Sequence, residues 1–342
     1  MHSVILKNDA VGDLIHSLKA INNITQSDAN KKVTIFLSKL SQNFSFLVKK
    51  PRVDIKILNY NLSIIEKIRL IFFLAKKDIQ NVYILSPKNF YYFLPLIFRK
   101  KNFYAICIDN LNNYKRPNLF LRKFLFKYEI NDRGKIFRRD STIKLQDNLT
   151  SSINKKKFTF DLKITKSEIQ KRHFPANYIF FHYKKKIFTE LNWKYTELEI
   201  LLNELSTFCG NIILTKDVGN DDNNFLFKKN FNSYDFKKRE YINNDKNILF
   251  LDNIVGMDLF SVIKYSKKVV AFHGMMTSIG FILNKPVLDL FHCKINTWND
   301  YQRYRNSFYE FKPKYRGYDF IIPRKNINKT IKKLKFSLSD DR

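Results

Sequence analysis

The chain of 342 residues is 44% hydrophobic and 15% aromatic, which excludes an intrinsically disordered or low-complexity protein. The chain is too long for a single domain with one ordinary hydrophobic core, and its length suits two domains of roughly 150 residues each. Lys and Arg total 62 against 31 Asp and Glu, which gives a net charge of +31. This excess either indicates an anionic partner or forms a solvated surface produced by biased composition, and the sequence leaves both interpretations open.

Cysteine usage and apolar runs bear on the cellular compartment. Cys107, Cys209 and Cys293 are odd in number and far apart, so we expect reduced thiols in a reducing compartment. The N-terminal residues lack the basic start, apolar core and cleavage site of a signal peptide, so we expect no targeting segment. The apolar runs 70–75 and 90–98 are shorter than the ~20 residues of a transmembrane helix. The sequence therefore predicts a soluble or peripheral protein.

The N-terminal half alternates short apolar runs with helical patterns, which is typical of a parallel β-sheet covered on both faces. A strand over 3–7 leads into a small polar turn and a helical pattern, the opening of an α/β unit. The longest helix is predicted over 64–77. Further strands are predicted over 33–39, 53–58, 82–86 and 104–109.

A polar stretch over 141–175 is interpreted as the connection between two domains, 1–165 and 166–342. A second α/β series follows it, in which the Asn-rich segment 217–246 is predicted to be a long exposed connection. The two halves together predict an α/β protein of two doubly wound, Rossmann-like domains. The second series comprises strands over 178–183, 211–216, 247–252, 269–274 and 286–291, with helices over 195–205 and 257–266.

Ligands of open α/β sheets bind at the carboxyl ends of the strands, and the first such end carries a candidate base. Gly12 permits a tight turn, and Asp13 stands at a helix start, where the helix dipole favours negative charge. The alternative is that Asp13 only caps the helix. Thr215, at the end of a later buried strand, is a weaker candidate.

Two further strand ends suggest anion binding. One is the run of Lys184, Lys185 and Lys186, which either meets a phosphate or is simply solvated. The other lies between a strand and a helix, where backbone N–H groups at a helix start form a ready anion site. Its candidate residues are His273, Gly274, Met275, Met276, Thr277 and Ser278.

Several catalytic and cofactor motifs are missing from the sequence. There is no G-x-G-x-x-G, Walker loop, G-x-S-x-G elbow or H-E-x-x-H motif. There is also no D-x-D pair, and the six histidines lack metal-ligand spacing. We therefore expect neither a bound metal ion nor a bound cofactor.

The densest basic stretch is 115–139, which has nine basic and two acidic residues. Apolar residues recur there near helical spacing between Leu119 and Tyr128. The pattern predicts a basic amphipathic helix suited to an anionic membrane or a phosphorylated glycolipid. The alternative is a core-facing helix with a cationic outer face.

Three segments resemble glycosyltransferase family 9, the lipopolysaccharide heptosyltransferases. Residues 4–21, VILKNDAVGDLIHSLKAI, look like the family's opening, in which a strand runs into a loop ending in Gly-Asp before a helix. Residues 263–291 are similar to its donor-site segment, and 178–186, YIFFHYKKK, to the opening of its C-terminal domain. Where the family often has a Pro after the Gly-Asp turn, this chain has Lys19.

In the donor segment, the strand, Gly-containing turn, helix and Pro286 are kept. Counting back from that proline places His273 at the family's Asp and Gly274 at its Thr. It also places Met275 at the family's Gly and Ser278 at its His, so all four residues differ from the pattern.

The resemblance implies two Rossmann-like domains that face each other across a cleft, the GT-B arrangement, with the acceptor side in 1–165 and the donor side in 166–342. It implies an inverting, metal-independent glycosyltransferase, heptosyltransferase-like, that uses a nucleotide-sugar and a lipopolysaccharide or other surface-glycan acceptor. Asp13 would be the base, while N–H groups of 274–278 and a lysine of 184–186 would hold the diphosphate.

The implied location is the cytoplasm, at the inner face of the cytoplasmic membrane, where 115–139 would contact an anionic lipid-linked acceptor. Three alternatives stay open: a GT-B transferase of a different sugar in capsule or glycan synthesis, a non-catalytic transferase-like protein, and a nucleic-acid-binding protein suggested by the charge. Because recognisable nucleic-acid motifs are missing, we expect no nucleic-acid partner.

Overall fold

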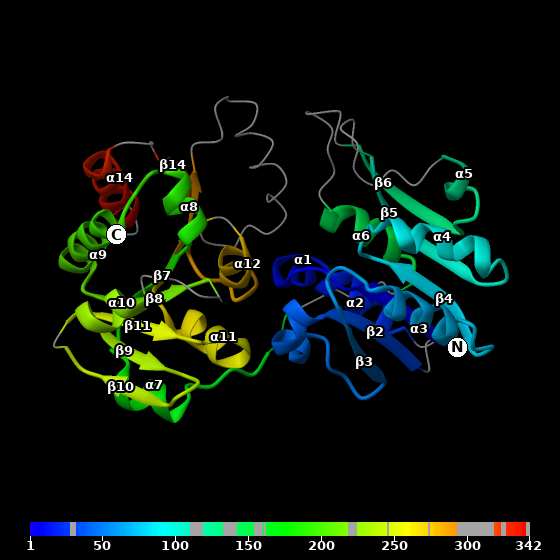
Figure 1. The fold of residues 1–342 in the computed structure, drawn as a ribbon, viewed down its shortest axis with the longest axis horizontal. Helices are drawn as coiled ribbons and strands as arrows, with labels where there is room; N and C mark the ends of the chain where they lie inside the picture. The colour runs from blue at the N-terminus through cyan, green and yellow to red at the C-terminus, as the bar shows by residue number, and fades with distance from the viewer. Residues whose placement is uncertain are drawn as a thin grey trace. The chain divides into compact units, whose positions relative to one another are not determined.

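Two largely parallel β-sheets organise the protein, one in each half of the chain (Figure 1). The described residues divide into two compact units between Leu162 and Lys163, whereas the sequence pattern places the boundary after residue 165. Among these residues, no helix combines the length and the apolar composition needed to span a bilayer. The computed structural model describes residues 1–27, 32–109, 119–132, 142–153, 160, 162–217, 224–244, 246–272, 274–292, 318–322 and 326–339.

The N-terminal unit contains a six-stranded parallel sheet with the order β3-β2-β1-β4-β5-β6. Val4, Ile5 and Leu6 of the central strand β1 are fully buried, as expected for a strand covered on both faces. The direction of winding reverses between β1 and β4, and ligands of doubly wound sheets bind at this position. The elements are β1 (His2–Lys7), α1 (Val11–His16), α2 (Leu18–Thr25), β2 (Lys32–Ser38), η1 (Lys39–Leu47), β3 (Val53–Leu58), α3 (Ile64–Leu74), β4 (Ile79–Ile84), α4 (Asn89–Ile97), β5 (Asn102–Asp109), α5 (Leu119–Arg122), β6 (Lys127–Asp132) and α6 (Thr142–Thr150).

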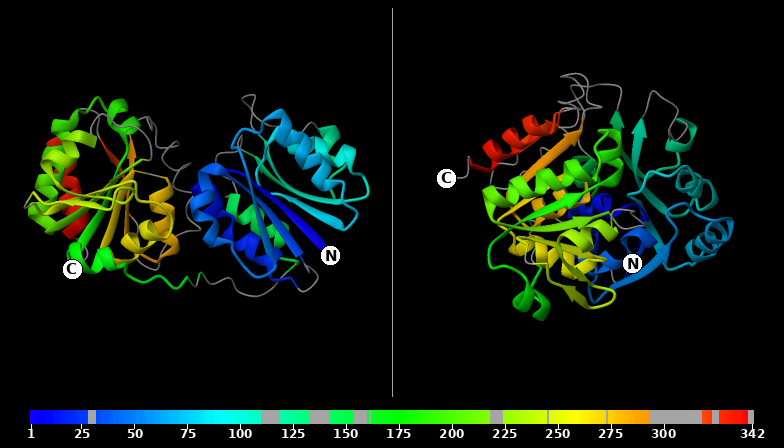
Figure 2. Two further views of the ribbon diagram at one scale, coloured as in Figure 1. Left: turned by 60° about the horizontal axis from the view of Figure 1, so that its bottom comes forward. Right: turned by 60° about the vertical axis from the view of Figure 1, so that its left-hand side comes forward.

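Helices cover both faces of this sheet, with α1, α2 and α6 on one face and α3, α4 and α5 on the other (Figure 2, left). The helix α6 packs against α2, where Lys19 Nζ lies 2.5 Å from Asp147 Oδ2. Its Leu145 and Leu149 are buried. The predicted interdomain connection over 141–175 is therefore wrong at its start, because α6 belongs to the N-terminal unit.

The basic stretch 115–139 does not form one amphipathic helix, so that prediction is wrong for its described residues. Only Leu119–Arg122 are helical, while Lys127–Asp132 form β6, the edge strand that pairs in parallel with β5. Pairing with a distant strand outweighs the local helical spacing here. Residues 115–118 and 133–139 lie outside the described residues.

The C-terminal unit contains an eight-stranded sheet with the order β10-β9-β11-β8-β7-β12-β13-β14. All pairs are parallel except β10 with β9 at one edge. The direction of winding reverses between β7 and β12. The elements are α7 (Glu168–His173), β7 (Tyr178–Tyr183), α8 (Lys185–Glu190), α9 (Tyr195–Cys209), β8 (Asn211–Lys216), α10 (Asn224–Asn230), β9 (Asn232–Asp235), β10 (Glu240–Ile242), β11 (Ile248–Asp252), α11 (Gly256–Tyr265), β12 (Lys268–Phe272), α12 (Met275–Ile282), β13 (Val287–His292), β14 (Tyr318–Ile322) and α14 (Ile327–Ser339).

The Asn-rich segment 217–246 is not an exposed connection, because its described part contains α10, β9 and β10. Phe227 and Phe231 from this segment are buried in the core of the unit. The prediction is wrong because the few apolar residues of the segment are enough to attach it to the sheet.

Candidate active site

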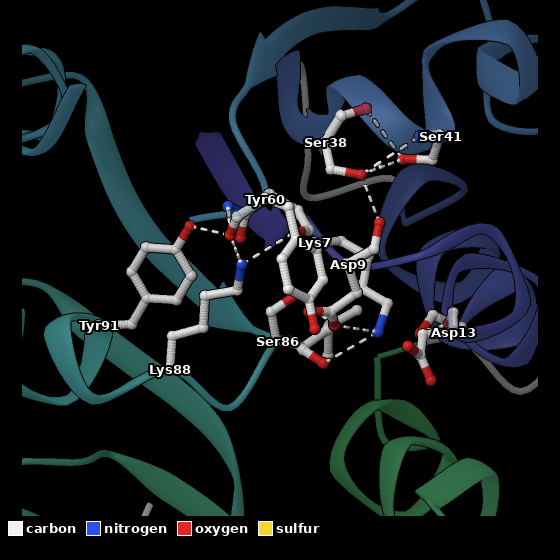
Figure 3. A network of polar contacts seen from close by, with 12 residues as sticks. Lys7, Asp9, Asp13, Ser38, Ser41, Tyr60, Ser86, Lys88 and Tyr91 are labelled. Carbon is white, nitrogen blue, oxygen red and sulfur yellow. Dashed lines mark hydrogen bonds and ion pairs between the residues drawn. The ribbon is translucent and has the colours of Figure 1, made fainter. Parts of the chain in front are cut away.

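The carboxyl end of β1 carries a buried ion pair (Figure 3). Lys7 Nζ lies 2.9 Å from Asp9 Oδ2, and Ser86 Oγ donates a hydrogen bond to the same oxygen at 2.6 Å. Burial disfavours the charged form of Asp9, but the ammonium of Lys7 and the hydroxyl of Ser86 outweigh it. The pKa of Asp9 therefore lies below its ordinary value. Asp9 is an ionised carboxylate whose hydrogen bonds fix the β1–α1 loop.

The same loop is anchored from two further elements. Tyr91 Oη donates to Asn8 Oδ1 at 2.6 Å, and Lys88 Nζ donates to the main-chain oxygen of Asn8 at 3.0 Å. The Lys88 ammonium also lies 4.3 Å from the centre of the Tyr60 ring. Tyr60 is 41% exposed, so it forms a rim beside the buried network. The sequence pattern did not single out any of these residues.

Asp13 lies beside this network on the first turn of α1, and it is exposed (Figure 3). The N-cap of α1 is Ala10, so the alternative that Asp13 caps the helix does not hold. Burial, Asp9 and Asp13 all raise the pKa of Tyr60, so negative charge at Asp13 acts on this rim. Gly12, the residue before Asp13, is half-buried.

In the C-terminal unit, the structure distinguishes among the three consecutive lysines. A Cβ added to Gly274 would lie 2.5 Å from Lys184 Nζ, so the ammonium occupies the space beside this glycine. Gly274, at φ 151°, is the N-cap of α12. Lys184 and Lys185 are both half-buried, and Lys186 is exposed. Lys184 is thus the lysine that lies at the N-terminus of α12.

The surroundings of Lys184 favour its neutral form more than water does. Burial lowers the pKa of Lys184, and the carboxylates of Asp217 and Asp289 oppose this effect only in part. Asp289 is 1% exposed and lies on β13, two strands away from β7. A bound anion beside Lys184 would restore the stability of its charged form.

A buried histidine lies next to this lysine, at the end of β7. His182 is 1% exposed, and its Nδ1 lies 2.9 Å from Thr215 Oγ1 while Nε2 lies 3.2 Å from Asp217 Oδ1. A carboxylate only accepts, so Nε2–H donates to Asp217 and Nδ1 accepts from Thr215. Burial lowers the pKa of His182, which keeps the ring neutral. The predicted site residue Thr215 is buried and positions this histidine.

Some polar groups in the first turn of α12 are hydrogen-bonded to one another. Gly274 N–H donates to Thr277 Oγ1 at 3.1 Å, and Thr277 Oγ1 donates to Gly274 O at 2.7 Å. Ser278 Oγ and N–H both donate to the same oxygen, at 3.2 and 3.1 Å. The hydroxyls of Thr277 and Ser278 thus close the turn. The donors suited to an anion are the N–H groups of Met275, Met276 and Thr277, beside Lys184.

Met275 is half-buried and Met276 is buried. What these two residues offer to an anion is their backbone N–H groups. His273 lies outside the described residues. Within the parts of the chain that the structure describes, no three His, Cys, Asp or Glu side chains are grouped to hold a metal ion.

Sequence reasoning singled out the right strand ends but missed several of their residues. Lys7 is the last residue of β1, Asp9 follows two residues later, and His182 is the next-to-last residue of β7. The rule that ligands bind at carboxyl ends therefore marks all three. Ser86 and Asp217 also follow strands, β4 and β8, but no short window of sequence shows that they pair with Asp9 and His182. The partner of Ser86, Asp9, is 77 residues away.

Comparison with known proteins identifies the fold. No protein-family model matches the sequence, and no curated protein is similar to it in sequence. A glycosyltransferase of family 9 from Veillonella parvula superposes with a TM-score of 0.63 at 11% identity, over 99% of this chain and 89% of that one. ADP-heptose lipopolysaccharide heptosyltransferase II from E. coli gives 0.63 at 12% identity, over 100% and 99%.

The E. coli heptosyltransferase WaaC with ADP-2-deoxy-2-fluoro heptose gives a TM-score of 0.61 at 12% identity, over 100% of both chains. The UDP-GlcNAc 2-epimerase of Methanocaldococcus jannaschii gives 0.59 at 13% identity, over 100% of this chain and 94% of that chain. The chain therefore has the fold of the GT-B glycosyltransferases and sugar-nucleotide 2-epimerases, built from two Rossmann-like domains.

Proposed function

We propose that the protein is a glycosyltransferase that moves a sugar from a nucleotide-sugar to a hydroxyl group of a surface-glycan acceptor. The observation that carries this proposal is the chemistry at the two switch points. An exposed carboxylate, Asp13, stands at that of the N-terminal unit. A half-buried lysine, Lys184, lies at the N-terminus of α12, at the switch point of the C-terminal unit.

The C-terminal site suits the diphosphate of the donor. Lys184 supplies positive charge, and the first turn of α12 supplies N–H donors and the positive end of a helix dipole. These groups would stabilise the negative charge that develops on the departing nucleoside diphosphate. The likeness to a heptosyltransferase solved with an ADP-sugar supports a nucleotide-linked donor.

The N-terminal site suits activation of the acceptor. Asp13 would take the proton of the acceptor hydroxyl as its oxygen attacks the anomeric carbon of the sugar. Asp9 is unsuited to this role because Lys7 and Ser86 already engage its carboxylate. One displacement breaks the bond to the diphosphate and inverts the anomeric configuration.

The finer proposal is a heptosyltransferase-like, metal-independent enzyme of lipopolysaccharide synthesis that works at the cytoplasmic face of the inner membrane. The likeness to two E. coli heptosyltransferases supports the sugar class. Thermal-shift screening with ADP-, UDP-, GDP- and CMP-linked sugars identifies the donor, and transfer in the presence of EDTA tests metal independence.

The central test is Asp13→Asn with the donor found in that screen. We expect turnover to fall by about 10²–10⁴-fold, because proton transfer by a positioned base contributes this much. Donor affinity should stay unchanged, since Lys184 and α12 are intact. Asp54→Asn, which changes an exposed carboxylate on β3, is the matched control and should keep full activity.

Wild-type turnover in Asp13→Asn would remove Asp13 from the proposed role. Product analysis tests the reaction itself, because the fold is shared with 2-epimerases. An epimerised nucleotide-sugar released without transfer would contradict the proposal of a transferase.

A further inference from the structure

Six of the eleven exposed large apolar side chains described in the N-terminal unit lie on two helices, α3 and α4. On α3, the exposed fraction is 73% for Ile64, 61% for Ile65, 47% for Ile68 and 72% for Phe72. On α4 it is 51% for Phe93 and 53% for Ile97. Scattered exposed apolar residues are normal, but a group of large ones marks an interaction surface. We call these six residues the α3–α4 face.

The two helices that carry the α3–α4 face are neighbours. Lys67 Nζ of α3 lies 5.7 Å from the centre of the Phe90 ring of α4. After the two helices end, Lys101 Nζ donates to the main-chain oxygens of Lys76 and Ile79, at 2.8 and 2.6 Å. Figure 2 (left) shows both helices in blue and cyan on one face of the N-terminal sheet.

The exposed stripe of α3 is not a by-product of poor packing. Ile64, Ile68 and Phe72 follow one another at four-residue spacing, so they share one side of the helix. Leu70 and Leu74 turn the opposite side into the core, where they are 1% and 0% exposed. The helix is thus apolar on two sides, and the outer side is left to another partner.

Basic residues surround the α3–α4 face. Residues 60–101 contain eight Lys and Arg and only two acidic residues. Of the acidic ones, Glu66 caps α3 by accepting hydrogen bonds from Ser63, and Asp78 pairs with His2. On the helical wheel, Lys67 and Arg69 flank the stripe on opposite sides. Lys76, Lys77, Arg99 and Lys100 follow the ends of the two helices.

We propose that the α3–α4 face docks the protein on an anionic lipid bilayer. Exposed Ile and Phe side chains would enter the headgroup region, and the surrounding ammonium and guanidinium groups would bind lipid phosphates. A second copy of this chain is the less suitable partner, because the net charge is +31 and both faces would bring the same basic border.

This face adjoins the rim of the N-terminal site. Lys88 precedes α4, and its ammonium reaches both the Tyr60 ring and the Asn8 main-chain oxygen of the β1–α1 loop. A bilayer on the α3–α4 face would therefore present lipid-anchored molecules near this rim. Only this last step rests on the proposed function, whereas the docking itself does not.

The test is co-sedimentation of the full chain with vesicles of phosphatidylcholine alone or with added phosphatidylglycerol. We expect binding only to the anionic vesicles, and loss of binding at high salt. Ile65→Ser combined with Phe72→Ser should lower the vesicle partition coefficient at least about tenfold, because two apolar side chains that would enter the bilayer are lost. Phe225→Ser is the matched control, since Phe225 of α10 is also 72% exposed.

A second pair of variants tests the charges. Lys67→Gln with Arg69→Gln should weaken binding by about 25-fold, from a contribution of about fivefold for each charge. Lys329→Gln with Lys332→Gln, which changes two exposed lysines of α14, removes the same charge elsewhere and should change binding far less. Unchanged binding by either α3 variant would overturn the proposal.

Two further readouts separate the possible failures. If analytical ultracentrifugation shows a dimer that the α3 variants dissociate, the partner is a second copy and the lipid proposal is overturned. Thermal shifts with the donor should be unchanged in all variants, because the substitutions leave Lys184 and α12 intact. Vesicle binding without any nucleotide-sugar binding would contradict the proposed function but leave the docking proposal standing.

Discussion

Lys184 illustrates how position in the fold separates identical residues. It is the first of three consecutive lysines, and only its ammonium lies against Gly274. Lys184 is the N-cap of α8, whereas Lys186 lies within that helix and is exposed. A run of three lysines contains no information that distinguishes them, so the sequence alone left the choice open.

The lowered pKa of Lys184 gives a testable pH dependence of donor binding. Burial lowers this pKa below 10.5, and a diphosphate binds the protonated amine. The affinity for ADP should therefore be retained where the amine is protonated and fall as the pH rises through the lowered pKa. The fall should approach about tenfold per pH unit, since one proton is linked to binding. Calorimetric titration from neutral to alkaline pH measures it.

The matched variants are Lys184→Gln and Lys186→Gln. The first should bind ADP weakly and without this pH dependence, while the second should keep the wild-type profile. If the affinity of Lys184→Gln for ADP fell with pH as steeply as that of the wild type, a group other than Lys184 would be titrating.

Asp13 and Asp9 show what residue type could and could not predict. The Gly-Asp pair after an apolar run was enough to single out Asp13, which the structure places on the first turn of α1. The more buried carboxylate, Asp9, was missed because its importance depends on Ser86 and Lys7. Its pKa shift arises from contacts that no short window of sequence contains.

Strand prediction succeeded at the scale of elements because buried parallel strands are continuous apolar runs. Strands over 53–58, 178–183 and 211–216 were predicted with the bounds that the structure has. The helix predicted over 64–77 starts where α3 starts, at Ile64, and in the structure Ser63 and Glu66 form a capping box there. Local signals of this kind lie within a few residues of each other.

The elements that were missed depend on distant partners. The polar composition of 217–246 predicts a long exposed connection, yet Lys228 Nζ lies 3.0 Å from Asp235 Oδ2 and 2.9 Å from Asp252 Oδ2. Each carboxylate is neutralised by a residue from another element, which permits burial. Polarity alone could not distinguish such paired charges from solvated ones.

Packing of α12 on the sheet gives a prediction at this scale. A Cβ on Gly280 would lie 2.7 Å from Val287 Cγ2 and 3.3 Å from Val269 Cγ2, closer than ordinary contacts. Gly280→Ala should therefore lower the free energy of unfolding by about 1–3 kcal/mol, although alanine is the better helix former. Denaturant unfolding monitored by circular dichroism measures the change.

The control is the double variant Gly280→Ala with Val287→Ala. Removing the valine methyl groups makes room for the new Cβ, so the double variant should be more stable than the sum of the two single effects. Strict additivity would show that the two side chains do not collide.

The whole molecule is two units with separate cores. One core comprises residues such as Leu6, Tyr91 and Phe103, and the other comprises residues such as Phe181 and Phe250. The alternation of strands and helices predicted two doubly wound domains, and the fold confirms them. The misplaced element was α6, because the amphipathic pattern of this helix is weak and its partner, α2, lies more than a hundred residues earlier.

The last prediction concerns the independence of the N-terminal unit. Residues 1–162 contain all six strands of the first sheet and should fold alone, with one cooperative thermal transition. Residues 1–141 should not, because they lack α6. That loss uncovers the surface that buries Leu145 and Leu149, and removes the partners of Lys19 and Asn23. Circular dichroism and amide chemical-shift dispersion distinguish the two outcomes. If residues 1–141 melted as cooperatively as residues 1–162, this domain would not need α6 to fold. The interdomain connection would then begin at residue 141, where the polar sequence begins.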